Sequence, residues 1–363
     1  MKIIIIAGAR PNFIKIAPLI HAIQHAVNSG KNIHYRLVHT GQHYDAKMSD
    51  TFFNELKIPM PDANLACGGG TQAEQTAAIM IAFEKELVAN PADIVVVVGD
   101  VTSTMACAIV AKKLNTKVAH IEAGIRSFDV SMPEEINRMV TDSITDYFFT
   151  TTEWASNNLR KSGIDEGRIF FVGNVMIDTL LANQHRFKKP GFWDEMGLAD
   201  SNYLVMTLHR PANVDGGSTL KELVNAIVTN VRKLAVIFPI HPRTAGIFTA
   251  LEIIAPNLHI VDPMSYFEFN FLVQHAKAVI TDSGGITEET TVMGIPCITL
   301  RDNTERPETC TIGTNELIGT NPAQIAPIMD KLFAGEWKKG AIPDLWDGHS
   351  SERIVAQILL LKS

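Results

Sequence analysis

Residues 93–100, DIVVVVGD, hold four consecutive valines and then leave the apolar run through Gly99 and Asp100. A strand with one side in water alternates polar and apolar residues. A continuous β-branched run is typical of a strand that is covered on both faces. Such strands belong to parallel sheets with helices on each side. The stretch therefore predicts a doubly wound α/β domain.

The same pattern recurs along the chain. A polar segment, NQHRFKKPGFWDEMG, separates two series of apolar runs. We therefore expect two Rossmann-like domains, residues 1–175 and 176–363, with the last helix able to pack back on the first domain. The other predicted strands are KIIIIA, HYRLVHT, KVAHIE, DYFFTTT and RIFFVG in the first series, and YLVMTLH, LAVIFPI, LHIVD, AKAVIT and PCITL in the second.

Composition narrows the function classes. The 363 residues are 46% hydrophobic and 20% charged, and the formal net charge is −7. The negative net charge argues against nucleic-acid binding, because phosphate contacts need clustered Lys and Arg. No apolar run reaches membrane length, and IIIIA is too short for a signal peptide. The chain has four dispersed cysteines and no CxxC pair, so we expect reduced thiols and a cytoplasmic protein.

Ligands of such sheets bind beyond the carboxyl ends of the strands, and with two domains we expect the site in the cleft between them. Asp100 and Glu122 each follow a predicted strand in the first domain. Both are therefore candidate functional acids. Glu134 follows Pro133 at a predicted helix start. Without further information, we expect Glu134 to have a structural role, in which its carboxylate interacts favourably with the positive end of the helix dipole and pairs with Arg138 one turn later.

The first strand ends in AGARPNFIK, which lacks the three glycines of a dinucleotide fingerprint. Arg10 at the helix entry, followed by Pro11, suits an anion such as a diphosphate. A surface ion pair explains Arg10 equally well. Lys15, one turn further, either reaches the same ligand or extends along the apolar helix face.

Histidines end two strands of the second domain. His209 precedes Arg210, and His241 lies two residues before Arg243. These histidines are candidates for a phosphate contact or for proton transfer. No HxxxH or HExxH pattern accompanies them, so we expect no metal site.

The stretch TDSGGITEE follows the predicted strand AKAVIT. Ser283, Gly284 and Gly285 open a helix whose free N–H groups suit a phosphate. Neighbouring helical residues diverge by roughly 100°, so only one of Glu288 and Glu289 can face a ligand, where it would accept hydrogen bonds from a ribose.

Two further residues of the second domain are candidates. Phe269 is either an aromatic face for a base or a core residue. Arg301 begins RDNTERPE at another strand end and is expected to face the same ligand.

Seven motifs in this order resemble the non-hydrolysing UDP-N-acetylglucosamine 2-epimerases over nearly the whole chain. They are GARPNFIK, GDVTST, HIEAGIRSFD, PEEINR, LHR, DSGGITEE and RDNTERPE. The resemblance implies a GT-B-like fold and reversible epimerisation at C2 of UDP-GlcNAc to UDP-ManNAc, in which UDP leaves by anti elimination to give 2-acetamidoglucal and then adds back. It also implies a homodimer that feeds cell-surface polysaccharide synthesis and uses neither metal nor cofactor.

Site residues carry over motif by motif. The resemblance implies that His209 lies near the diphosphate and that Glu289 contacts the ribose. It implies catalytic roles for Asp100, Glu122, Glu134 and His209, phosphate contacts for Arg10, Ser283, Gly284 and Gly285, a uracil stack for Phe269 and a functional position for Lys15. His241 and Arg301 are expected to contact the UDP-sugar from their places at strand ends.

Two positions depart from the family's pattern. Many members read HRxEN where this chain has HRPAN, residues 209–213, so the contact of that glutamate is missing. Gln42 and His43 match a segment through which many bacterial members bind substrate as an allosteric activator. The segment CGGGTQAEQT supplies no arginine, however, which puts this regulation in doubt.

Several alternatives stay open. The substrate could be a related nucleotide sugar such as a UDP-2,3-diacetamido-glucuronic acid. A hydrolysing epimerase would release free ManNAc. A glycosyltransferase of the same fold would need an acceptor site but not three acids at the ends of first-domain elements. A UDP-sugar sensor would bind the same ligand without turnover.

Overall fold

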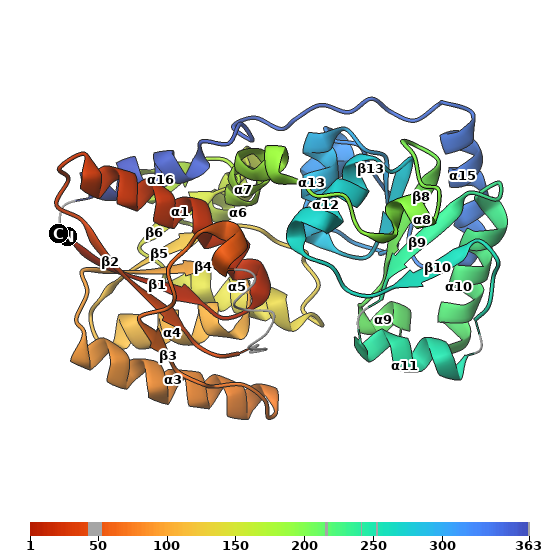
Figure 1. Cartoon of the computed structure of the whole chain (residues 1–363). Coiled ribbons are helices and arrows are strands. Elements are labelled where there is room, and N and C mark those ends of the chain that lie inside the picture. The colour runs from red at the N-terminus through yellow and green to blue at the C-terminus, as the bar shows by residue number, and fades with distance from the viewer. Residues whose placement is uncertain (43–52, 215–216, 241, 252, 362–363) are drawn as a thin grey trace. The chain divides into compact units, whose positions relative to one another are not determined.

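The computed structural model describes residues 1–42, 53–214, 217–240, 242–251 and 253–361. The chain forms two compact units (Figure 1). Unit 1 contains residues 1–182 and 344–363, and unit 2 contains residues 183–343. Among the described residues, no helix is both long and apolar enough to cross a bilayer.

Unit 1 is built on a seven-stranded sheet with the order β3-β2-β1-β4-β5-β6-β7, in which all neighbouring strands are parallel. The six strands predicted for this half are confirmed, and the two-residue β3 joins them at the edge. The strands are β1 (Lys2–Ala7), β2 (His34–His39), β3 (Ala63–Asn64), β4 (Ile94–Val98), β5 (Lys117–Ile121), β6 (Tyr147–Thr150) and β7 (Ile169–Phe171).

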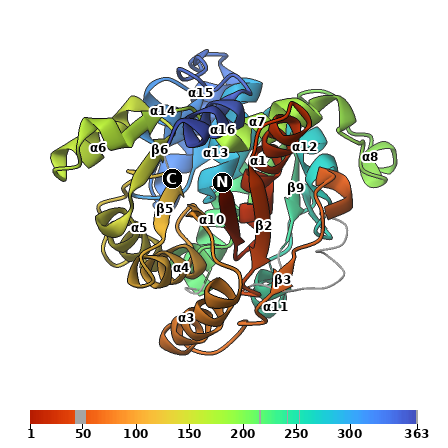
Figure 2. The same cartoon turned by 90° about the vertical axis from the view of Figure 1, so that its left-hand side faces the viewer.

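Helices cover both faces of this sheet, as parallel strands require. In Figures 1 and 2, α3 and α4 lie on one side of the sheet while α1 and α16 lie on the other. Helix α5 packs on α4, and α16 packs on α1. The helices are α1 (Arg10–Asn28), α3 (Gln72–Ala89), α4 (Thr102–Lys113), α5 (Pro133–Ile144), α6 (Glu153–Lys161), α7 (Val175–Asn183) and α16 (Ser350–Leu360), with a 3-10 turn at Glu166–Arg168.

Unit 2 repeats the architecture with a six-stranded parallel sheet in the order β10-β9-β8-β11-β12-β13. The five predicted strands are confirmed, and β13 adds the far edge. The strands are β8 (Tyr203–Thr207), β9 (Ala235–Pro239), β10 (Leu258–Val261), β11 (Ala278–Thr281), β12 (Cys297–Thr299) and β13 (Asn315–Leu317).

Alternate residues of β8 enter hydrophobic clusters of different composition. Leu204 packs with residues of α10 and α15, whereas Val205 packs with residues of α8 and α12. The sheet is therefore buried on both faces, which is why its strands read as continuous apolar runs. The helices are α8 (Phe192–Glu195), α9 (Pro211–Val214), α10 (Gly217–Asn230), α11 (Pro242–Ala250), α12 (Tyr266–Gln274), α13 (Gly284–Met293), α14 (Pro307–Thr311) and α15 (Ile325–Phe333), with 3-10 turns at Gln184–Arg186 and Pro322–Gln324.

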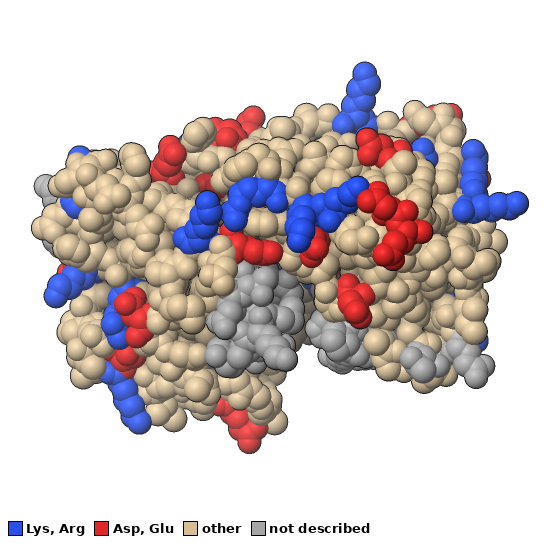
Figure 3. All heavy atoms as spheres, in the orientation of Figure 1, with Lys and Arg blue, Asp and Glu red and all other residues tan. Residues whose placement is uncertain are grey.

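Charged side chains on the face drawn in Figure 3 are mixed in sign, with acidic groups beside most basic ones. A face of mixed sign is unlike the continuous basic stripe that a nucleic-acid backbone selects.

Candidate functional site

Lys15 and Glu122 meet at the carboxyl end of the unit 1 sheet. Lys15 projects from the second turn of α1, Glu122 follows β5, and Lys15 Nζ lies 2.6 Å from Glu122 Oε2. Both side chains are almost entirely buried. Glu122 has a φ of 69°, an uncommon value for a residue with a side chain. Backbone strain of this kind clusters at functional sites, and here it directs a carboxylate toward a cation.

Asp100 lies beyond the adjacent strand β4 and is also paired. Arg138 of α5 donates to Asp100 Oδ2 from Nε at 3.0 Å and from Nη2 at 2.8 Å. The side-chain amide of Asn137 donates to the Asp100 carbonyl at 2.9 Å. Helix α5 therefore fixes Asp100 at backbone and side chain, while the carboxylate remains 30% exposed.

The two neighbouring glutamates at the start of α5 have different surroundings. Glu134 is exposed, whereas Glu135 is buried and accepts hydrogen bonds from the backbone of Ser127 and Phe128. Arg138 donates to Glu135 at 2.5 Å. From the sequence, both glutamates were expected to favour the helix dipole and Glu134 to pair with Arg138, whereas Arg138 pairs with Glu135. In the structure, Glu135 anchors the loop that precedes α5 and leaves Glu134 at its surface.

A buried pair behind these acids was not foreseen. His120 of β5 lies against Asp142 of α5, with Nδ1 and Oδ1 2.7 Å apart. Burial alone would raise the pKa of Asp142, but His120 and Arg126 hold that pKa below its usual range. A histidine inside the apolar strand KVAHI was the sequence signal for a buried polar partner, because an imidazole in a core needs hydrogen bonds.

In unit 2, Asp282 organises the turn that follows β8. It is fully buried and accepts hydrogen bonds from the backbone N–H groups of His209 and Arg210 and from the amide of Asn213. His209 Nδ1 lies 2.8 Å from Asp282 Oδ1, and the His209 side chain is 52% exposed. Burial opposes ionisation of Asp282, yet His209 and these donors hold its pKa below the usual range.

The first turn of α13 begins at Gly284, with Ser283 as the N-cap residue and Gly285 next in the turn. A Cβ at Gly284 would lie 2.6 Å from Glu305 Oε1. Glu305 is held in place because Arg301 donates to its other carboxylate oxygen at 2.6 Å. A side chain at this position would displace the Glu305 carboxylate. The helix start has the free N–H groups that bind anions.

Glu288 and Glu289 have separate partners, as helical geometry requires. Glu288 lies 2.5 Å from Nε of Arg306, whereas Glu289 accepts a hydrogen bond from the Tyr266 hydroxyl at 2.7 Å. Burial raises the pKa of Glu289 to about 7, against the lowering effect of the Tyr266 hydrogen bond. Phe269, on the same helix as Tyr266, is half-buried and packs against the hydrophobic cluster of α8 and α12.

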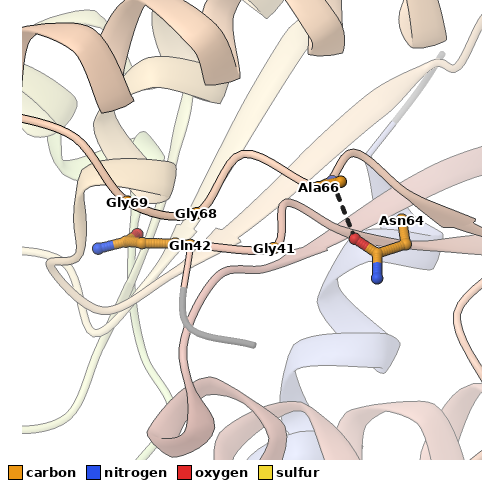
Figure 4. Close-up of a pocket in the computed structure, with 6 residues that line it drawn as sticks. All are labelled: Gly41, Gln42, Asn64, Ala66, Gly68 and Gly69. Carbon is orange, nitrogen blue, oxygen red and sulfur yellow. Dashed lines mark hydrogen bonds between the residues drawn. The ribbon is translucent and has the colours of Figure 1, made fainter. Parts of the chain in front are cut away.

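Gln42 lies at a hollow of about 510 Å³ in unit 1 (Figure 4), lined by Gly41, Gln42, Asn64, Ala66, Gly68 and Gly69. Its side-chain oxygen accepts hydrogen bonds from the backbone N–H of Ser103 at 3.1 Å and from the Ser103 hydroxyl at 2.7 Å. Gln42 therefore contacts the first turn of α4.

Three predicted site positions fall outside the part of the chain that the structure describes. They are His43, His241 and the side chain of Arg10. Within the described ranges, no three His, Cys, Asp or Glu side chains are grouped so that they could hold a metal ion.

Two doubly wound α/β units in one chain define a GT-B-like fold, as predicted. The family model described as UDP-N-acetylglucosamine 2-epimerase matches residues 25–359. The chain therefore belongs to the UDP-N-acetylglucosamine 2-epimerase family, and the predicted resemblance is confirmed.

Individual relatives agree with this assignment. The UDP-N-acetylglucosamine 2-epimerase of Methanocaldococcus jannaschii is 42% identical over 98% of each chain. The crystal structure of that enzyme in complex with UDP-GlcNAc and UDP has a TM-score of 0.90 and 41% identity, and it covers 99% of this chain and 100% of its own. A Pseudomonas aeruginosa UDP-2,3-diacetamido-2,3-dideoxy-D-glucuronate 2-epimerase is 39% identical over 88% of each chain.

Proposed function

We propose that this protein interconverts UDP-GlcNAc and UDP-ManNAc by anti elimination and re-addition of UDP. The observation that carries the proposal is the buried Lys15–Glu122 pair at the carboxyl end of the unit 1 sheet, in a chain of this family. The proton at C2 is not next to a carbonyl, so a base must remove it as the C1–O bond breaks and UDP departs with the bonding electrons.

Unit 1 supplies the acids and bases of this scheme. Lys15 pairs with Glu122 as an ammonium with a carboxylate, and the carboxylate is the form that accepts a proton. Asp100 and Glu134 are the other carboxylates that transfer protons or stabilise the oxocarbenium-like centre. Epimerisation requires removal of a proton at one face of C2 and delivery of a proton at the opposite face. Two carboxylates on opposite sides of the sugar can carry out these two steps.

Unit 2 holds UDP. The N–H groups of Ser283, Gly284 and Gly285 bind the diphosphate at the start of α13, and Glu289 accepts hydrogen bonds from the ribose. His209, oriented by Asp282, contacts the diphosphate as it leaves. The remaining contacts that we propose are Phe269 with the uracil, and Arg10, His241 and Arg301 with the phosphates.

Proton NMR of the reaction in deuterium oxide tests substrate, product and exchange together. We expect UDP-ManNAc to accumulate to an equilibrium, with deuterium at C2 in both sugars. Free ManNAc plus UDP would instead show a hydrolysing epimerase. Binding of UDP-GlcNAc without exchange at C2 would show a sensor.

A second substrate is supported by the Pseudomonas aeruginosa relative, whose name gives UDP-2,3-diacetamido-2,3-dideoxy-D-glucuronate. The same NMR experiment with this sugar in a parallel tube separates the candidates. We expect kcat/KM to favour UDP-GlcNAc, and a preference for the diacetamido uronate would replace our proposal.

We further propose that the protein acts as a homodimer through the face formed by α3, α4 and α5. Apolar side chains on this face are exposed although its helices pack on one another, which is typical of an interface. They are Ile81, Val88, Ile136 and Met139, each at least 48% exposed. Ile136→Glu combined with Met139→Glu should yield a monomer in sedimentation analysis, and an unchanged mass would refute this interface.

We also propose a cytoplasmic protein whose product feeds cell-surface polysaccharide synthesis. All four cysteines are free thiols, and three of them are buried. Reduced, unpaired cysteines are typical of the cytosol. Cell fractionation and the sugar composition of the surface polysaccharide after gene deletion test these two statements.

A further inference from the structure

The histidine–aspartate pair behind the unit 1 acids has an unusual hydrogen-bond arrangement. His120 is fully buried, and Asp142 is almost so. His120 Nδ1 lies 2.7 Å from Asp142 Oδ1, and His120 Nε2 lies 2.8 Å from the carbonyl oxygen of Gly99. Both ring nitrogens therefore face oxygen atoms inside the core.

These oxygens determine the protonation of the ring. A carbonyl oxygen can only accept, so Nε2 carries a hydrogen. Asp142 Oδ2 accepts from the backbone N–H of Gly124 at 3.0 Å and lies 2.6 Å from the guanidinium of Arg126, which together favour its ionised form. An ionised carboxylate also only accepts, so Nδ1 carries a hydrogen as well.

The charges of the surrounding groups agree with this protonation. Charged groups in a core are stable when they are paired with groups of opposite sign. The Asp142 carboxylate is buried between Arg126 and His120, so a charged His120 gives it a second partner of opposite sign.

The pair connects the turns that carry two candidate catalytic acids. Gly99 directly precedes Asp100, and Gly124 lies two residues after Glu122. Both glycines have positive φ, as does Glu122. We infer that His120 is an imidazolium, with hydrogen on both ring nitrogens, that together with Asp142 positions the turns of Asp100 and Glu122.

The charge is essential to this role. A neutral imidazole has one N–H, so it would leave a ring lone pair facing either the Gly99 carbonyl or the Asp142 carboxylate. The turn that lost its donor would move. A displacement of about 1 Å in a catalytic group can cost about 100-fold in rate. His120 and Asp142 are positioning residues, since they act through the backbone of the turns.

Nitrogen-15 NMR of protein labelled at histidine tests the protonation state without reference to activity. The resonances of His120 are assigned by their absence from a His120→Gln variant. We expect both ring nitrogens to show the chemical shifts of an imidazolium at pH 8. The shifts of a neutral tautomer at pH 8 would overturn the inference.

The positioning role rests on the proposed function and is tested by kinetics. Asp142→Asn should lower kcat for UDP-GlcNAc by about 10- to 100-fold, while KM and the dissociation constant of UDP change less than threefold. Because UDP is held by unit 2, a loss confined to kcat separates positioning from general loss of structure. Turnover within twofold of the wild type would overturn the role.

Asp146→Asn is the matched control at the opposite end of β5. Asp146 also accepts a backbone hydrogen bond, from Val118 at 2.8 Å, and pairs with Lys112 at 2.8 Å. We expect its kcat to stay within threefold of the wild type. An equal loss in both variants would show that Asp142 contributes only stability. Wild-type protein without epimerase activity would refute the proposed function and leave the NMR result standing.

Discussion

Lys15 and Glu122 are 107 positions apart in the sequence and are joined by a buried 2.6 Å ion pair. The pair forms because α1 and β5 both bring their residues to the carboxyl end of one parallel sheet. Gly99 completes the arrangement, since a Cβ there would lie 3.3 Å from Lys15 Nζ and 3.6 Å from Glu122 Oε2. The ends of the adjacent strands β4 and β5 and the second turn of α1 therefore meet at one ammonium–carboxylate contact.

Glu122→Gln should reduce turnover of UDP-GlcNAc by about 10²- to 10⁴-fold, because an amide cannot accept the C2 proton. Binding of UDP, measured by calorimetry, should stay within threefold. Glu86→Gln is the control, since Glu86 forms an ion pair of the same length with Arg36 elsewhere in unit 1. Full turnover in Glu122→Gln would remove this residue from the mechanism.

Glu289→Gln should weaken UDP binding by roughly 10- to 100-fold, because a charge-assisted hydrogen bond to the ribose is worth about 1.5–3 kcal/mol. The pKa of Glu289 is raised to about 7, so wild-type affinity for UDP should fall as the pH drops below 7. The variant should lack this component of the pH dependence. Calorimetric titrations between pH 5.5 and 8.5 measure both effects.

The raised pKa of Glu289 also links stability to pH. Its ordinary value is 4.5, so the folded protein favours the protonated form, and this contribution is lost as the pH rises through about 7. We therefore compare the free energy of unfolding in urea of Glu289→Gln with that of the wild type at two pH values. The variant's value relative to the wild type should be higher at pH 8.5 than at pH 4.5, by up to about 3 kcal/mol. An equal difference at both pH values would contradict this assignment.

Glu308→Gln serves as a comparison for both Glu289 experiments. Burial raises the pKa of Glu308 to about 7 as well. The same pH-dependent gain in stability is expected, but UDP binding should stay within threefold. A weakening of UDP binding equal to that of Glu289→Gln would mean that the ribose contact does not explain the effect.

Gly284→Ala should weaken UDP binding by roughly 10- to 100-fold, because the new Cβ collides with Glu305 and overpacking at a rigid site costs about 1–3 kcal/mol. Glu305 cannot move away without breaking its contact with Arg301. Gly246→Ala in α11 is the control, where the added Cβ meets no atom within 4 Å. Equal UDP affinities in the two variants would rule out the start of α13 as the diphosphate site.

Asp282→Asn should destabilise the protein by about 2–4 kcal/mol at pH 7, since the amide lacks the negative charge that accepts three hydrogen bonds at Oδ2 and places an NH2 group at Oδ1, where His209 lies 2.8 Å away. The pKa of Asp282 is lowered from 3.8, so its contribution is present above pH 3.8 and lost as the pH falls through the folded value. The difference in urea unfolding should therefore shrink below pH 3.8.

Asp330→Asn provides the reference for this series. Asp330 is 81% exposed and lies 4.0 Å from Arg232, so its loss should cost less than about 1 kcal/mol at either pH. Comparable losses in Asp282→Asn and Asp330→Asn would show that the buried hydrogen bonds of Asp282 contribute little.

Much of the fold was predictable because burial on both faces of a parallel sheet appears directly in the sequence. A run such as IVVVV is typical of a strand that is covered on both faces, and all five of its residues are buried in β4. The edge strands β3 and β13 escaped detection. β3 has only the two residues AN (63–64) and β13 only the three residues NEL (315–317), and neither forms an apolar run.

The candidate site was predictable in part. The divergence of Glu288 and Glu289 follows from helix geometry alone, and the structure gives them different partners. The burial of Glu135 beside an exposed Glu134 depends on how the preceding loop folds back onto α5, which no local pattern encodes. The catalytic and ligand contacts of the named residues stay predictions.

The pairing of His120 with Asp142 was not predicted for a related reason. The two residues are 22 positions apart on different elements, and only the packing of α5 against the sheet brings them together. A single sequence shows which polar residues need a partner in the core, but not which partner they find.

Unit 1 is assembled from two separated pieces of the chain. Asp178 accepts hydrogen bonds from the first residues of α16, and Trp346 donates from its indole N–H to the Thr151 carbonyl. During synthesis, unit 2 is complete before residues 344–363, the second piece of unit 1, are made. A chain that stops shortly before residue 344 would therefore contain all of unit 2 but would lack α16 and the hydrogen bonds by which residues 346, 350 and 351 complete unit 1.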